Sequence, residues 1–243
     1  MGVRWLLVGL WLYGGAATAE VIQVLSYHNH PPFVTGPMQG QTYQLVRQLN
    51  ALAPPGLRFQ VELLPRVRLN QRLQGWIDGE CPARPCDDGW LVPWVNPNWG
   101  FRPPGGDPYH WLAQAEDANV IVSRQSDPID YQQPASLDGK VLGGVRGHRY
   151  MGIDERVAAG RIERVDGNVE RDNLLMLLYG RVDAVLLPES TVNYFLQQDP
   201  TLRPHAQAFY IAPVRHQRYA RSIMLPATRA DLERLIGRVL EAR

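Results

Sequence analysis

The side chains best suited to binding chemistry stand at the end of one predicted strand. The stretch LDGKVLGGVRGHRY, residues 137–150, begins as a buried strand and ends in hydrogen-bond donors: Arg146, His148, Arg149 and Tyr150. Arginine forms planar, two-pronged contacts with carboxylates or phosphates. The pattern favours a group of anion-binding residues; the alternative is that both arginines are solvated side chains at the start of a surface helix.

Composition and motifs exclude several classes of protein. The chain has 243 residues, 45% of them hydrophobic and 20% charged, with a formal net charge of +1. This composition is typical of a globular protein and shows no basic excess for nucleic acid. The sequence has no G-x-S-x-G, no H-E-x-x-H and no phosphate-binding loop. We therefore expect no enzymatic activity, no cofactor and no nucleic-acid partner.

The first residues predict export from the cytoplasm. Arg4 precedes a short apolar run over 5–13, and Ala17-Thr18-Ala19 fits the A-x-A cleavage pattern. Residues 1–19 are therefore interpreted as a signal peptide, with an uncleaved anchor as the alternative. We expect the mature chain to be soluble, periplasmic and monomeric.

Two cysteines stand close together in the sequence CPARPC. An oxidising compartment favours a disulfide between Cys81 and Cys86, with two free thiols as the alternative. Their spacing matches neither a C-x-x-C redox motif nor a zinc site. His28 and His30 lack a third ligand at a telling spacing, so no metal is expected.

Strands and helices alternate along the chain, which predicts an α/β fold with parallel sheets. Strands are predicted over 21–27, 58–65, 89–95, 118–124, 140–145, 161–166, 182–187, 208–214 and 220–226. Helices are predicted over 41–52, 67–77, 150–159, 169–179, about 189–198 and a C-terminal segment. The last helix has Thr228 as its expected cap, Asp231 in the capping-box position and an apolar stripe.

The order of these elements resembles the bacterial extracellular solute-binding proteins of family 3, the type II periplasmic binding proteins of polar amino-acid transport. The resemblance covers nearly the whole mature chain. It is carried by YHNHPPF, LQGWIDG and SLDGKVLGGVRGHRY, and most specifically by NLLMLLYGRVDAVLLPES, residues 173–190.

The resemblance implies two α/β lobes joined at a hinge around a ligand cleft. Lobe 1 would span residues 20–109, a crossing segment 110–123 and lobe 2 residues 124–209. Residues 210–243 would return and add the C-terminal helix to lobe 1. The segments ANVIVSR and AFYIAPV would carry the chain across.

The same resemblance implies which residues face the ligand. In lobe 2, Gly147 would let the backbone approach a ligand between Arg146, His148, Arg149 and Tyr150, near a helix N-terminus. In lobe 1 and beyond, the implied ligand-binding residues are Tyr27, His30, Phe33, Arg66, Arg68, Trp94, Asn96 and Glu189. For Phe33 the alternative is a core position, and for Arg66 and Arg68 it is solvated surface. Glu189 would hold a ligand ammonium or cap the following helix with Ser190.

One part of the family pattern is missing. Amino-acid binders carry a serine or threonine and an arginine for the ligand carboxylate where this chain reads WVNPNWGFR. The resemblance thus implies a small polar ligand, anionic or zwitterionic and amino-acid-like, delivered to an ABC permease or a membrane sensor. The first alternative is an interaction module of the same fold, its cleft plugged by Trp94 or Trp99. The second is an enzyme on this fold.

Overall fold

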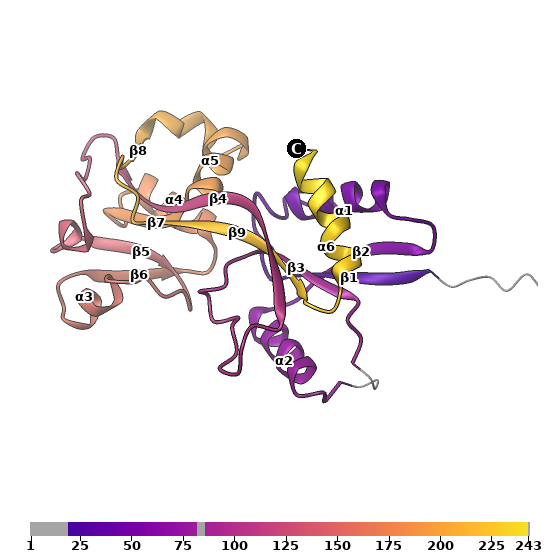
Figure 1. The fold of residues 1–243 in the computed structure, drawn as a ribbon. Helices are drawn as coiled ribbons and strands as arrows, with labels where there is room; N and C mark the ends of the chain where they lie inside the picture. Colours follow the sequence, from indigo (N-terminus) through magenta and orange to yellow (C-terminus); the bar gives the residue numbers. More distant parts are fainter. Residues whose placement is uncertain (1–18, 82–85, 243) are drawn as a thin grey trace, which may run out of the picture.

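The computed structural model describes residues 19–81 and 86–242, so the predicted signal peptide lies almost entirely outside the described residues. Figure 1 shows two halves joined by two long strands that run side by side. Among the described residues, none of the helices combines the length and the apolar character that a membrane crossing requires.

The elements largely follow the predicted alternation. The strands are β1 (Glu20–Ser26), β2 (Leu57–Leu63), β3 (Trp90–Val95), β4 (Tyr109–Arg124), β5 (Val141–Val145), β6 (Glu163–Gly167), β7 (Ala184–Pro188), β8 (Phe209–Ile211) and β9 (Gln217–Pro226). The helices are α1 (Gln41–Leu52), α2 (Arg66–Ile77), α3 (Asp154–Ala158), α4 (Glu170–Leu178), α5 (Glu189–Gln198) and α6 (Ala230–Glu241). Short 3₁₀ turns cover Pro134–Leu137 and Arg203–Ala208.

The strands form one continuous sheet in the order β2-β1-β3-β9-β4-β7-β5-β6, with β8 added beside β4. The β1–β2, β1–β3, β5–β6 and β5–β7 pairs are parallel, whereas β3–β9, β4–β9 and β4–β7 are antiparallel. Two α/β halves, each containing parallel strand pairs, are therefore connected by the antiparallel pair β4–β9. The α/β class and the two-lobed fold predicted from the sequence are confirmed.

The return crossing lies later in the chain than the sequence suggested. The AFYIAPV segment contributes only the short β8, which pairs with the far end of β4. The long return strand is β9, paired with β4 from Asn119↔Gln217 to Tyr109↔Pro226. Pro213 has no backbone N–H and cannot continue a ladder, which separates the two strands.

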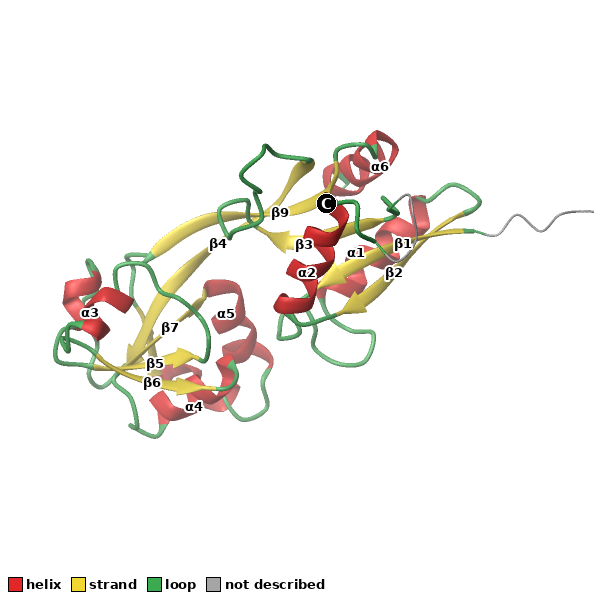
Figure 2. Cartoon of the chain, turned by 90° about the horizontal axis from the view of Figure 1, so that it is seen from below, coloured by secondary structure: helices red, strands yellow, loops and turns green. Residues whose placement is uncertain are grey.

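Each half has its own core on both faces of its strands. In lobe 1, Leu45 of α1 and Ile236 of α6 pack on one face of the sheet with Phe59 of β2, and α2 packs on the other face through Leu69. In lobe 2, α4 and α5 cover one face and α3 the other, as Figure 2 shows. Strands β5 and β7 place buried aliphatic side chains in these cores, and β8 adds the buried ring of Phe209.

Two predicted helix starts are wrong. The residue before α6 is Arg229, without a side-chain cap, and the Thr228 hydroxyl instead bonds Asp88 at 2.5 Å. The helix expected from residue 150 begins at Asp154, because Gly147 adopts φ 81° and His148 N bonds Val145 O across a turn. The free N–H groups expected near His148 therefore belong to a turn and not to a helix.

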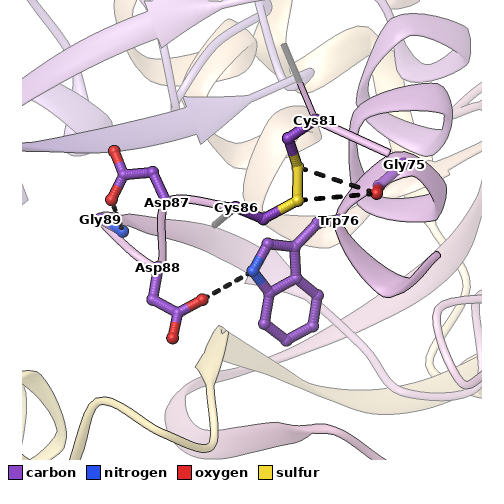
Figure 3. Close-up of a disulfide and its surroundings, with 7 residues drawn as sticks. All are labelled: Gly75, Trp76, Cys81, Cys86, Asp87, Asp88 and Gly89. Atoms are coloured by element: carbon purple, nitrogen blue, oxygen red, sulfur yellow. Dashed lines mark hydrogen bonds between the residues drawn. A yellow bond between two sulfur atoms is a disulfide. The ribbon is translucent and has the colours of Figure 1, made fainter. Parts of the chain in front are cut away.

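The predicted Cys81–Cys86 disulfide is confirmed, with the two Cα atoms 5.3 Å apart. Figure 3 shows both sulfur atoms beside the Gly75 carbonyl at the end of α2, and the Trp76 indole bonded to Asp88. The bridge ties Cys81, after the end of α2, to Cys86, before the start of β3.

Candidate functional site

A buried ion pair lies where β4 and β9 pass from one lobe to the other. Arg221 Nε donates to Asp117 Oδ2 at 2.8 Å, and the side chains are 4% and 3% exposed. Next to this pair, β9 still pairs with β3 on one side, and β4 begins its pairing with β7 at Asn119. The pair therefore stands at the midpoint of the crossing.

The carboxylate of Asp117 also binds lobe 2. Ser190, at the start of α5, donates from its hydroxyl at 2.7 Å and from its backbone N–H at 3.2 Å. Ala118 N donates to the same carboxylate at 2.9 Å. Asp117 thus accepts bonds from a helix N-terminus, from its own strand and from Arg221. Such a network compensates the cost of burying both charges.

The guanidinium of Arg221 is surrounded by aromatic rings. Its Cζ lies 4.7 Å from the Phe33 centroid, 5.4 Å from Trp99 and 5.2 Å from Tyr219. Its Nη1 donates to Trp94 O at 3.1 Å and its Nη2 to the Tyr219 hydroxyl at 3.3 Å. We call the groups around this guanidinium the Arg221 box: Phe33, Trp94, Trp99, Asp117 and Tyr219.

Two strand irregularities build the box. The β4–β9 register shifts between Ala113 and Ala115, and the β3–β9 register shifts between Val92 and Val95. Trp94 lies in the second irregularity at φ 67°, and its indole donates to the Thr42 hydroxyl at 3.0 Å. Bulges of this kind redirect a side chain; here they bury the Trp94 ring and aim its carbonyl at Arg221.

A buried histidine borders the box. His28 is 7% exposed, its ring centroid is 5.0 Å from Phe33, and its Nε2 has no hydrogen-bond partner among the residues that the structure describes. Burial, and then the charge of Arg221, lower the pKa of His28 well below its usual value. His28 is therefore a neutral ring at neutral pH.

The lobes contact each other next to the box. His30 Nε2, in the loop after β1, is 3.6 Å from Glu170 Oε1 at the start of α4. The Thr191 hydroxyl of α5 donates to Pro31 O at 3.2 Å. Beyond this contact a cleft of about 660 Å³ separates the loop before α1 from α5. The cleft is lined largely by amides from both lobes: Gln39, Gln41, Gln44, Asn193, Gln197 and Gln198.

Arg66 uses its guanidinium for contacts inside lobe 1. It lies over the rings of Phe101, at 4.0 Å, and of Tyr27, at 5.0 Å. It donates to Trp99 O at 2.6 Å and to the Tyr27 hydroxyl at 3.2 Å. Burial raises the pKa of Tyr27 above its usual value. Arg68 is exposed on the same helix, α2.

The two arginines that follow β5 lie in a different setting. Arg146 and Arg149 are exposed, and neither guanidinium has a hydrogen bond or ion pair with any residue that the structure describes. His148 is also exposed, whereas Tyr150 is 6% exposed and its hydroxyl accepts from Val145 N at 2.9 Å. Burial raises the pKa of Tyr150 to about 12. Tyr150 is thus a core residue of lobe 2.

The remaining predicted residues have partners within the chain. Phe33 and Trp94 are walls of the box, and Asn96 donates to Ala220 O at 2.8 Å. Glu189 forms an ion pair with Arg215, whose Nε is 3.2 Å from Oε2. Glu189 is therefore already paired with a cation of this chain.

The sequence reasoning missed the centre of the site: Asp117, Ser190, Tyr219 and Arg221. Each charged residue stands in a β-rich run, AEDANVIV or RYARSIML, where a lone charge is normally assigned to the solvent face. Which face it occupies depends on register, and the bulge in β4 changes that register. The sequence carried no pairing signal for them, because AFYIAPV was the predicted return crossing and Arg221 lies in the later strand β9.

No family model and no curated protein matches the sequence. Solved structures do match. The GluR0 ligand-binding core in complex with L-glutamate has 13% identity and a TM-score of 0.63, covering 94% of this chain and 93% of that chain. The amino acid ABC transporter substrate-binding protein AbpA from Streptococcus pneumoniae, bound to L-arginine, has 14% identity and a TM-score of 0.58, covering 92% and 88%.

The periplasmic VFT2 domain of BvgS from Bordetella pertussis has 17% identity and a TM-score of 0.56, covering 91% of this chain and 87% of that chain. At these identities the likeness concerns the fold. Together with the two α/β halves and their paired crossing strands, it shows that this chain has the type II periplasmic binding protein fold.

Proposed function

We propose that this chain is a non-enzymatic periplasmic binding protein that holds a small anionic or zwitterionic molecule between its lobes. The observation that supports this is the pair Arg146 and Arg149, exposed beyond the carboxyl end of β5 without any partner among the described residues. Ligands of open α/β sheets bind beyond the carboxyl ends of the strands. Two unpaired guanidinium groups there offer charge-assisted bonds to a carboxylate.

The partner is proposed to be a membrane permease or a membrane sensor. The solved structures that share the fold include one named as an ABC transporter substrate-binding protein and one named as a periplasmic domain of BvgS. The predicted signal peptide supports the same compartment. The implied ligand carries at least one carboxylate and is small enough for a cleft between lobes.

The experiment is ligand identification. Native mass spectrometry of the mature protein, purified without denaturation, should show a mass increment that disappears on unfolding. Thermal melts are then recorded with a panel of dicarboxylates, L-glutamate and L-aspartate. One chemical class of ligand in this panel should raise the melting temperature of the protein. If no adduct appears and no anion in the panel shifts the melt, the proposal is wrong.

A second candidate is an interaction module of the same fold without a transported solute. The observation that favours it is the filled Arg221 box, in which Phe33, Trp94 and Trp99 surround the guanidinium of Arg221 beside the crossing strands. This candidate predicts the negative outcome of the ligand screen.

A further inference from the structure

We infer that Arg221 is a ligand supplied by the chain itself: its guanidinium fills a binding site for a guanidinium cation and closes that site to free cationic molecules. This site is distinct from the proposed anion-binding arginines, and the inference does not depend on them. It is carried by the contacts of the Arg221 box and by how its walls are held.

The box contains more than a salt bridge needs. The guanidinium donates hydrogen bonds to a carboxylate, a backbone carbonyl and a phenolic oxygen, from Asp117, Trp94 and Tyr219. Three aromatic rings lie within 5.4 Å of its Cζ. Planar acceptors around the edge and rings nearby are the chemistry by which proteins recognise a guanidinium.

The walls have bonds that do not involve Arg221. The Trp94 indole is held by Thr42, Asp117 by Ser190 and Ala118, and the Tyr219 hydroxyl by Asn119 at 3.2 Å. Removing the arginine side chain therefore leaves a lined cavity with an unpaired carboxylate. A buried carboxylate without a balancing cation is costly even when hydrogen-bonded, so the cavity should bind a cation of matching shape.

The box also joins the parts of the molecule that would move. Phe33 and Trp94 belong to lobe 1, Arg221 and Tyr219 to the crossing strand β9, and Asp117 carries the bond to Ser190 of α5 in lobe 2. A free ligand that drives lobe closure contacts both lobes. Arg221 makes this connection permanently, through its bond to Asp117.

The test removes the Arg221 side chain by mutation and supplies the same atoms as a free cation. Arg221→Ala removes the equivalent of ethylguanidinium, so ethylguanidinium chloride should bind this variant and raise its melting temperature. At ten times the dissociation constant the expected rise is roughly 3–6 °C, measured against sodium chloride at equal ionic strength. The wild type should show no binding in calorimetry and no rise.

Two variants serve as controls. Arg221→Met fills the cavity with an uncharged chain and should not respond. Arg124→Ala removes an arginine that bonds Val182 O and Asp183 without an aromatic ring, and should not respond either. If Arg221→Ala is unfolded without additive, recovery of its circular dichroism spectrum on refolding with ethylguanidinium is the readout.

The inference is overturned by either of two results: Arg221→Ala responds no more than Arg124→Ala, or wild type binds ethylguanidinium as tightly as the alanine variant. Neither result bears on whether Arg146 and Arg149 bind an anion, since the ligand screen of the wild type answers that separately.

Discussion

Arg221 and the pair Arg146 and Arg149 show one side-chain type in two opposite environments. Arg221 is 3% exposed, and its guanidinium is bonded to Asp117, Trp94 O and Tyr219. Arg146 and Arg149 are exposed and have no side-chain partner among the described residues. A guanidinium whose donors are satisfied within the chain contributes to stability and architecture. One whose donors are free can contribute to recognition of another molecule.

Arg66 lies between these extremes and shows that position in a predicted cleft does not decide the role. It is half-buried at the start of α2, stacked on Tyr27 and Phe101, and bonded to Trp99 O. Its donors are used to hold aromatic residues of lobe 1 in place. Variants of these arginines should therefore separate stability from binding.

The largest effect is expected from Arg221→Met. The variant keeps the volume but leaves Asp117 as a buried carboxylate without its cation, which typically costs about 3–5 kcal/mol. Urea denaturation measures the free energy of unfolding. The Asp117→Asn/Arg221→Met double variant should recover part of this loss, because it removes both charges. A single-variant loss below about 1 kcal/mol would show that the pair is not fully buried.

The next effect is expected from Arg66→Ala. It removes the bonds to Trp99 O, the Tyr27 hydroxyl and Asn70, together with two ring contacts. Because Arg66 is half-exposed, we expect a loss of about 1–2 kcal/mol. Arg68→Ala, two residues along the same helix and exposed, is the matched control and should change stability by less than about 0.5 kcal/mol. Equal losses of stability in Arg66→Ala and Arg68→Ala would show that the contacts of Arg66 contribute no more than those of a solvated arginine.

The third effect concerns binding alone. The double variant Arg146→Ala/Arg149→Ala should bind the identified ligand with an affinity at least tenfold weaker in calorimetric titration, which corresponds to about 1.4 kcal/mol. Its free energy of unfolding should stay within about 0.5 kcal/mol of the wild-type value. Arg181→Ala, an exposed arginine before the amino end of β7, is the control and should leave affinity unchanged. Unchanged affinity in the double variant would show that Arg146 and Arg149 are solvated surface residues without a role in binding.

These contrasts explain what the sequence could and could not predict. Apolar periodicity indicated most strands and helices, and export with two neighbouring cysteines indicated the Cys81–Cys86 bridge. Both rest on short-range patterns, which the chain carries locally. The order of elements then indicated the two-lobed fold.

The centre of the site depends on contacts that no local pattern records. Arg221 meets Asp117 across 104 residues, and the pairing of β4 with β9 brings the two buried side chains together. Glu189 was predicted to be free for a ligand or a cap, yet Arg215, unremarkable in sequence, pairs with it. Local residue type indicates that a charge can bind; the fold decides what it binds.

The smallest effect is a pH dependence of stability that reports on the Arg221 box. Burial, with the Arg221 charge second, lowers the pKa of His28, so the folded state keeps the ring neutral while the unfolded chain protonates near pH 6.5. The unfolded state then binds more protons, and stability falls as pH falls through that value.

Between pH 7 and pH 6 the loss from His28 should be about 0.7 kcal/mol. Urea midpoints of wild type and His28→Phe, compared at both pH values, isolate this contribution from His148 and His216, whose pKa values are also lowered by partial desolvation of their rings. An identical dependence in wild type and His28→Phe would mean that His28 is reached by water, and that the box next to it is open.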